Sequence, residues 1–169
     1  MNREQLQQAQ APIKARYRED PTASLVTLSA TGSVDGEGIV CSVETGRALA
    51  RAGLHPASGG DGSLLCSGDM LLQALVACAG VTLQAVATSM EILVSGSVLA
   101  EGDLDFRGTL GVDKQVPVGF QAIRLTFELE TAAPQDQLDR LLELTERYCV
   151  VLQTLSHGVS VSASLQRAG

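Results

Sequence analysis

The 169-residue chain has the size of one domain, and its composition, with 45% hydrophobic and 18% charged residues, is that of an ordinary globular protein. A formal net charge of -7 and an aromatic content of 3% without tryptophan exclude the basic footprint and stacking platforms of nucleic-acid binding. The polar amino terminus, MNREQLQQAQ, lacks the apolar core of a signal peptide, so we expect a cytoplasmic protein. Its four cysteines are then expected to be thiols rather than a disulfide framework.

The start of the chain predicts a helical extension followed by a β-hairpin. Residues 1–20 are rich in Gln, Arg, Glu and Ala, which favours a helix, and Pro12 indicates a break or a fresh helix start within it. Ser24–Ala30 and Gly38–Glu44 have the composition of strands, and the turn-rich sequence GSVDGEG joins them. We therefore expect these two strands to form a hairpin.

The chain is organised around an apolar helix that begins at Ser67. Thr45–Ser67 before it is irregular and glycine-rich, and loops of this length are often functional. Ser67 is placed to cap the helix, and Asp69 complements the positive end of its dipole. Small and apolar residues then cover every side from Met70 to Val81, as in a helix that is buried or spans a membrane. Glutamines and threonines within the run, and the absence of a positively charged flank, favour a buried core helix without a membrane partner.

Alternating apolar and polar residues predict three strands after this helix. Val98–Phe106 and Ile123–Leu129 each have one apolar face and one wet face, with Asp105 on the wet face, and GVDKQVPVG between them is a loop. Gly158–Gln166 alternates in the same way and closes the chain.

A second helix is expected between the last two strands. It covers Pro134–Leu155, because Pro134 suits a first turn and an apolar stripe that includes Cys149 follows at helical spacing. The chain contains no internal repeat and no linker. We therefore expect one α+β domain over residues 1–169, with residues 1–20 as an N-terminal helical extension.

The motifs of metal, phosphate and serine chemistry are missing from the sequence. There is no CxxC, His55 and His157 are far apart, and neither a GxxxxGK[ST] loop, a dinucleotide fingerprint nor GxSxG occurs, so no metal and no cofactor are expected. Thiols remain. Because free cysteine often packs as a small hydrophobic residue, the pattern alone leaves open which of the four thiols is functional. They are Cys41 in a strand, Cys66 before the central helix, Cys78 within it and Cys149 in the second helix.

The segment GGDGSLLCSGDMLLQALVACAGVTL resembles the OsmC/Ohr family, the osmotically inducible protein C and organic hydroperoxide resistance proteins. Members have a Gly-rich loop, a long helix with an Ala-Cys pair, and a second cysteine that commonly occurs as Arg-x-Cys-Pro-Val. Here RYCVV supplies Arg147, Cys149 and Val151, and Val150 stands at the proline position. FRGTLGVDKQVPVGFQAIRLTFEL is similar to the strand–loop–strand of the family, and the resemblance extends roughly from Leu25 to Leu165.

This resemblance implies a cysteine-based peroxidase that reduces organic hydroperoxides. Cys78 would be the peroxidatic thiol and Cys149 its disulfide partner, and a dithiol reductant would restore both. The family also implies an arginine from the loop before the central helix, held by a carboxylate. Arg51 or Arg47 could supply the cation and Asp69 the carboxylate, with Arg51 nearer His55 and the glycine loop. The implied fold is an intertwined homodimer in which antiparallel sheets wrap around the paired central helices, with the site at the interface.

The residues also allow a function of a different class. A dimeric binding module could hold an apolar ligand in a pocket at the interface, with both cysteines packed as core. The reactivity of the thiols at neutral pH separates the two hypotheses, because packing cysteines have no unusually fast thiol.

Overall fold

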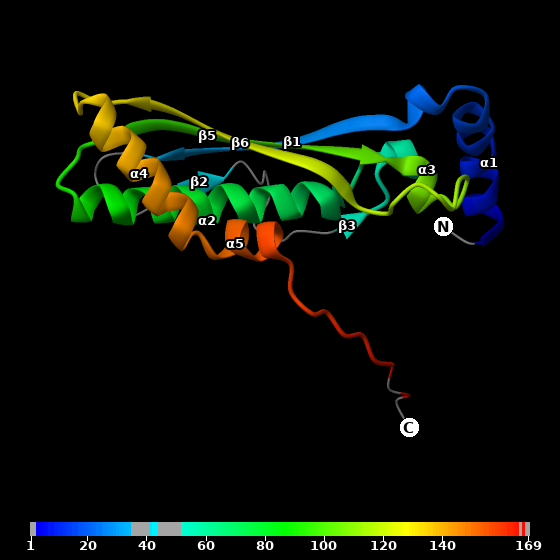
Figure 1. Ribbon diagram of the computed structural model, residues 1–169. Helices are drawn as coiled ribbons and strands as arrows, with labels where there is room; N and C mark the ends of the chain where they lie inside the picture. Colours follow the sequence, from blue (N-terminus) through cyan, green and yellow to red (C-terminus); the bar gives the residue numbers. More distant parts are fainter. Residues whose placement is uncertain (1–2, 35–40, 44–51, 166, 168–169) are drawn as a thin grey trace.

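An antiparallel sheet lies along the long helix α2 (Ser67–Ser89) in the computed structural model, which describes residues 3–34, 41–43, 52–165 and 167 (Figure 1). The described part of the sheet has the strand order β2-β1-β5-β6. Helices α4 and α5 also pack on α2, and buried α2 side chains such as Leu75 and Leu83 form the centre of the core. The α+β class is confirmed. The bounds are β1 Leu25–Val34, β2 Cys41–Val43, β5 Ser95–Asp105, β6 Phe120–Glu130, α4 Gln135–Tyr148 and α5 Val150–His157.

The N-terminal extension forms α1 (Arg3–Glu19), which is continuous through Pro12. The expected break at Pro12 is therefore wrong: the proline deletes one backbone donor without ending the helix. The last turn of α1 is held to the body by Tyr17, which is fully buried and donates from its hydroxyl to the carbonyl oxygen of Ala57 at 2.9 Å.

The expected hairpin is confirmed, although its first strand is longer than its composition predicts. β1 and β2 pair in antiparallel fashion, with Gly32 opposite Val43 and Val34 opposite Cys41. β1 thus continues into Gly32–Val34, which we expected to belong to the turn. β1 pairs with β5 along its whole length, and this pairing supplies hydrogen-bond partners for its backbone.

The irregular segment before α2 contains short elements that the sequence pattern does not predict. β3 (Ala52–Gly53) and β4 (Leu65–Cys66) form a parallel pair, and a single helical turn covers Pro56–Ser58. Strands of two residues are too short to produce a period. The N-cap of α2 is Cys66, which makes no side-chain capping bond, so the expected cap at Ser67 is wrong by one position.

α2 is long and apolar enough to cross a membrane by length and composition alone, but half of its apolar window is buried within this chain. This burial matches the expected core helix. The apolar face of β5 lies against it, and Val98, Ala100 and Gly102 of β5 are buried, as their alternation predicts.

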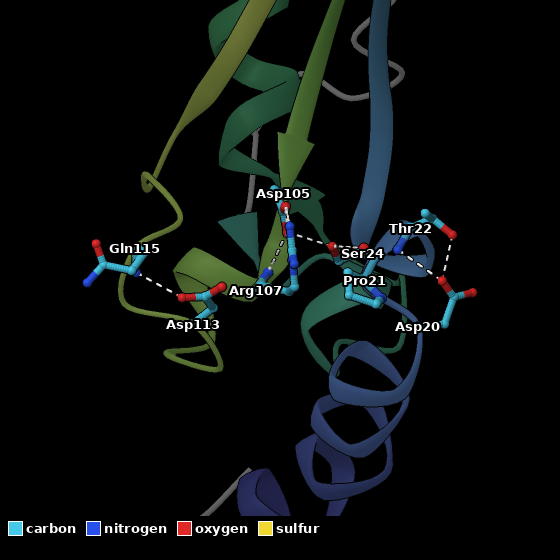
Figure 2. A network of polar contacts seen from close by, with 8 residues as sticks. All are labelled: Asp20, Pro21, Thr22, Ser24, Asp105, Arg107, Asp113 and Gln115. Atoms are coloured by element: carbon cyan, nitrogen blue, oxygen red, sulfur yellow. Dashed lines mark hydrogen bonds and ion pairs between the residues drawn. The ribbon is translucent and has the colours of Figure 1, made fainter.

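Asp105 is the exception to the alternation of β5. It was expected on the wet face, but it is only 3% exposed, because it is the last residue of β5 and is enclosed where the chain turns into the short helix α3 (Phe106–Thr109). Its carboxylate accepts hydrogen bonds from the Ser24 hydroxyl at 2.6 Å and from the Arg107 backbone and guanidinium (Figure 2). The Arg107 guanidinium is the main reason that the pKa of Asp105 falls to about 2.

The second expected helix is broken in two. α4 ends at Tyr148 and α5 begins at Val150, because Cys149 between them is extended, with φ −71° and ψ 106°. The expectation of one helix over Pro134–Leu155 is wrong at this residue. No proline or glycine marks the break, so the local sequence carries no signal for it.

The expected C-terminal strand is also wrong within the single chain. Residues 158–165 form no strand, and the segment extends away from the body (Figure 1). Its alternating apolar side chains Val159, Val161 and Leu165 are exposed, Leu165 to 95%. A strand requires a partner strand, and this segment finds none among the described residues of its own chain.

Candidate thiol site

Cys78 lies near the middle of α2 and is half-buried. It packs against the main core, with the small residues Ala77 and Ala79 on either side of it in the sequence. The residues four positions away on its own face are Ala74 and Thr82, which are small enough for a second element to approach this part of α2 closely. The element that does so is α5.

Cys149 lies at the break between α4 and α5 and is fully buried, at 0% exposure. It is the N-cap residue of α5, and its backbone N–H still donates to Thr145 at the end of α4 at 2.9 Å. The break therefore leaves Cys149 attached to both helices and starts a new helix beside α2. Cys66, Cys78 and Cys149 are all free thiols in the described structure.

The structure brings Cys78 and Cys149 into hydrogen-bonding contact. Burial raises the pKa of the Cys78 thiol, but hydrogen bonds outweigh this effect and leave the pKa below its ordinary value. The donors are the backbone N–H groups of Val151 and Val150, the Cys149 thiol and the Thr82 hydroxyl one helical turn along α2. The Cys78 sulfur is thus surrounded by groups that favour a thiolate.

The pKa of the Cys149 thiol is shifted in the opposite direction. Burial raises its pKa to about 11, and the neighbouring Cys78 adds to this increase. At neutral pH Cys149 therefore keeps its proton and can donate it in a hydrogen bond, whereas Cys78 is the easier of the two to ionise. The pair has one potential nucleophile and one protonated partner, and this asymmetry is what sulfur exchange chemistry uses.

Asp69 and His55 lie away from the two thiols. Asp69 is in the first turn of α2, nine residues before Cys78, which corresponds to about 13 Å along the helix axis. Burial raises the pKa of Asp69, and the nearby His55 opposes that rise. The His55 ring stacks on Phe106 at 5.1 Å and accepts from Ala57 N–H through Nδ1 at 3.0 Å.

The two candidate arginines, Arg47 and Arg51, lie outside the described residues, so their approach to Cys78 and to Asp69 stays a prediction. Arg147, which stands close to Cys149 in the sequence, places its guanidinium 5.5 Å from the centre of the Tyr148 ring. The site as described thus rests on neutral donors around Cys78 rather than on a cation.

Cys66 is separate from the thiol pair. Cys66 lies at the start of α2, twelve residues before Cys78, and lines a cavity of about 380 Å³ together with His55. The side chain of Cys41 lies outside the described part. In the described structure, no group of three or more His, Cys, Asp or Glu side chains could hold a metal ion.

An apolar groove of about 630 Å³ lies among α2, β6 and α4. Leu75, which lines it, is one turn before Cys78 on α2, and Leu152 of α5 lines it a few residues after Cys149. Residues three apart on a helix are neighbours, so the groove lies next to the thiol pair, although neither Cys78 nor Cys149 lines it. Gln135, Asp139 and Glu146 add polar groups to its lining.

Sequence reasoning did not identify three of the groups around Cys78. Thr82 could have been found from its spacing, because positions i and i+4 of a helix are neighbours. The N–H groups of Val150 and Val151 could not, since they are free donors only because the helix breaks at Cys149.

A known family matches the sequence of the chain, and a known structure matches its fold. The family model described as OsmC-like protein matches residues 60–164, which is more than half of the chain. The chain is similar in structure to an OsmC-like hydroperoxide resistance protein from Jannaschia sp. CCS1, with a TM-score of 0.57 and 15% identity over 85% of this chain and 95% of the other. No curated protein matches the chain. The extent of the family match nevertheless shows that the chain belongs to the OsmC-like family.

Proposed function

We propose that this protein is a thiol peroxidase that reduces organic hydroperoxides through Cys78 and Cys149. The observation that carries the proposal is the contact between these thiols together with their opposite pKa shifts, downward for Cys78 and upward to about 11 for Cys149. Membership of the OsmC-like family supports a peroxide-related activity, as does the similarity to a hydroperoxide resistance protein.

The reaction uses the two thiols in sequence. The Cys78 thiolate attacks the terminal oxygen of the hydroperoxide, the O–O bond breaks, and the departing alkoxide takes a proton to become an alcohol. Cys78 is then a sulfenic acid. The Cys149 sulfur attacks it, its thiol proton leaves with the hydroxyl as water, and a disulfide forms. A dithiol reductant returns two electrons and two protons and regenerates both thiols.

The groove beside the site favours an organic substrate. Its lining is dominated by leucines and by apolar β6 side chains such as Phe127, and a chain or ring attached to the peroxide would bury apolar surface there. Hydrogen peroxide cannot make such contacts. We therefore expect a lower KM for a bulky hydroperoxide such as cumene hydroperoxide than for hydrogen peroxide.

The proposal includes a homodimer. Two features support it: β6 is the edge of the described sheet, and the exposed residues 158–165 have the alternation of a strand without a partner. Exposed apolar strands of this kind pair with another chain unless they are covered. Sedimentation should show a dimer, and removing residues 158–169 should weaken it. A monomer at micromolar concentration would contradict this part.

Arg51 is proposed as an additional cation for Cys78, with Asp69 as its carboxylate partner. Substituting Arg51→Ala should slow the oxidation of Cys78 more than Arg47→Ala does. Equal rates of Cys78 oxidation in both variants and in the wild type would show that neither arginine takes part in the reaction.

The central test adds one equivalent of cumene hydroperoxide to the reduced protein and maps cysteine peptides by mass spectrometry. The expected product is a Cys78–Cys149 disulfide. Cys78→Ser should form none and lose turnover, whereas Cys149→Ser should consume one equivalent and stop at the sulfenic acid. Unchanged thiols in the folded wild type would contradict the peroxidase. The apolar groove would then favour the second function, a binding module for an apolar ligand.

A further inference from the structure

The first turn of α5 contains donors that the helix itself cannot satisfy. The first N–H groups of any helix have no carbonyl partner within it, and in α5 these groups begin at Val150. Gln153 is the first residue of α5 whose N–H reaches back to Cys149, at 2.9 Å. The N–H groups of Val150 and Val151 instead meet the Cys78 sulfur on α2, and the Val151 N–H is shared with the Cys149 sulfur.

We propose that the start of α5 is a thiolate-binding cradle, in which the Val150 and Val151 N–H groups and the Thr82 hydroxyl hold the ionised sulfur of Cys78. The proposal rests on the proposed function in taking Cys78 as the reacting thiol. It adds backbone donors and one hydroxyl to the catalytic machinery, independently of any arginine.

Three features of the fold place the cradle at the sulfur. α5 packs directly on α2, and the extended backbone of Cys149 makes the chain start a new helix there rather than continue α4. The positive end of the α5 dipole then lies near Cys78, where it favours an anion. Thr82 is one turn from Cys78 on α2 and adds a donor from the same helix as the thiol.

The side chain of Val150 contributes little to this arrangement. It is 70% exposed, so its backbone, and not its packing, is what reaches the site. In the family motif Arg-x-Cys-Pro-Val, which this segment resembles, the position of Val150 is commonly a proline. Proline has no N–H. The extra donor is therefore a property of this chain.

Apart from Cys149, no described charged or titratable side chain is among the main groups that act on Cys78. Cys78 is the only titratable residue of α2 from Met70 to Ser89. On α5, His157 lies at the far end and contacts Gln153 O at 3.2 Å. Among the neighbouring elements, β2 carries Cys41, and the end of α4 carries exposed Glu146, Arg147 and Tyr148, besides Cys149 itself.

Val150→Pro removes one cradle donor and leaves the fold intact. Proline is favoured at the first position of a helix, and the extended backbone of Cys149 suits a residue that precedes proline. The matched control is Val150→Ala, which trims the same exposed side chain but keeps the N–H. Thermal unfolding of both variants checks that the fold is unchanged.

The readout is the rate at which iodoacetamide alkylates Cys78 as a function of pH, followed by mass spectrometry of its peptide. Val150→Pro should raise the pKa of Cys78 and slow alkylation at neutral pH roughly threefold to tenfold, the effect of one hydrogen bond of ordinary strength. Val150→Ala should match the wild type. An unchanged pKa in folded Val150→Pro would overturn the cradle.

A second pair of variants tests the hydroxyl. Thr82→Val removes the donor and should raise the pKa of Cys78, whereas Thr82→Ser keeps it and should not; equal pKa values in the two would remove Thr82 from the cradle. Alkylation needs no hydroperoxide, so these results are independent of the peroxidase test. A shifted pKa without disulfide formation would keep the cradle and reject the peroxidase, and the reverse result would reject only the cradle.

Discussion

Asp105 at the end of β5 and Cys78 in the middle of α2 are two acidic groups held by hydrogen-bond donors. The Asp105 carboxylate accepts hydrogen bonds from the Ser24 hydroxyl and a backbone N–H, and it forms an ion pair with the Arg107 guanidinium. The Cys78 sulfur accepts hydrogen bonds from backbone N–H groups, a hydroxyl and a protonated thiol, and all of these donors are neutral.

The two surroundings give the two groups different roles. A paired cation takes the pKa of Asp105 to about 2, so its charge is fixed throughout the physiological range and stabilises the fold. Neutral donors lower the pKa of Cys78 but leave the group able to gain and lose a proton. The comparison suggests that full compensation of charge produces a structural contact, whereas partial compensation produces a reactive group.

The largest expected effect is on stability at Asp105. Its pKa is about 2, against 3.8 for an unperturbed aspartate, and this difference corresponds to about 2 kcal/mol. Asp105→Asn should therefore lower the free energy of unfolding by about 2 kcal/mol, measured by urea denaturation at pH 7. An unchanged denaturation midpoint would mean that the network does not stabilise the fold.

The same contribution should disappear in acid. Because the folded pKa of Asp105 is below the unfolded value, its stabilisation is complete above about pH 4 and is lost as the pH falls through about 2. Urea denaturation across this range should show the stabilities of wild type and Asp105→Asn converging at low pH. A constant difference between the two proteins would contradict this assignment.

A smaller effect is expected at the thiol site. Cys149 donates to the Cys78 sulfur, so Cys149→Ala should raise the pKa of Cys78 and slow its alkylation at neutral pH, by about tenfold at most. Cys149→Ser keeps a donor of similar size and should stay closer to the wild type. If Cys149→Ala makes Cys78 more reactive, Cys149 restrains the thiolate instead of supporting it.

The smallest effect on stability is expected at Asp103, which lies two residues before Asp105 on the same strand. Asp103 forms an ion pair with Arg124. Both side chains of this pair are exposed, and exposed ion pairs contribute little to stability. Asp103→Asn should leave the denaturation midpoint close to that of the wild type. A loss as large as that of Asp105→Asn would show that burial is not what separates the two aspartates.

Periodicity was sufficient to predict the large elements of this fold. The apolar run of α2 and the alternation of β5 and β6 are long enough to carry a clear signal. Elements that depend on distant partners were not predicted. β3 and β4 are two residues each, and the C-terminal alternation indicates a strand whose partner is not in the described chain.

The thiol site could be predicted in part. The positions of Cys78 and Cys149 followed from the sequence, and their pairing followed from the family resemblance. The burial of Asp105 could not be predicted, because the contacts with Ser24 and Arg107 that enclose it form only where β5 turns into α3. Nor could the break at Cys149, since neither proline nor glycine marks it and tertiary packing sets the backbone there.

The position of the α5 donors in the sequence has a consequence for synthesis of the protein. Val150 follows Cys78 by 72 positions, so a nascent chain that has emerged only as far as β6 contains the thiol and Thr82 but not the α5 donors. Cys78 in that chain is an ordinary thiol, mostly protonated at neutral pH. In the proposed mechanism Cys78 gains the α5 donors only after α5 has left the ribosome and docked on α2, so the unfinished chain would be less easily oxidised at this residue.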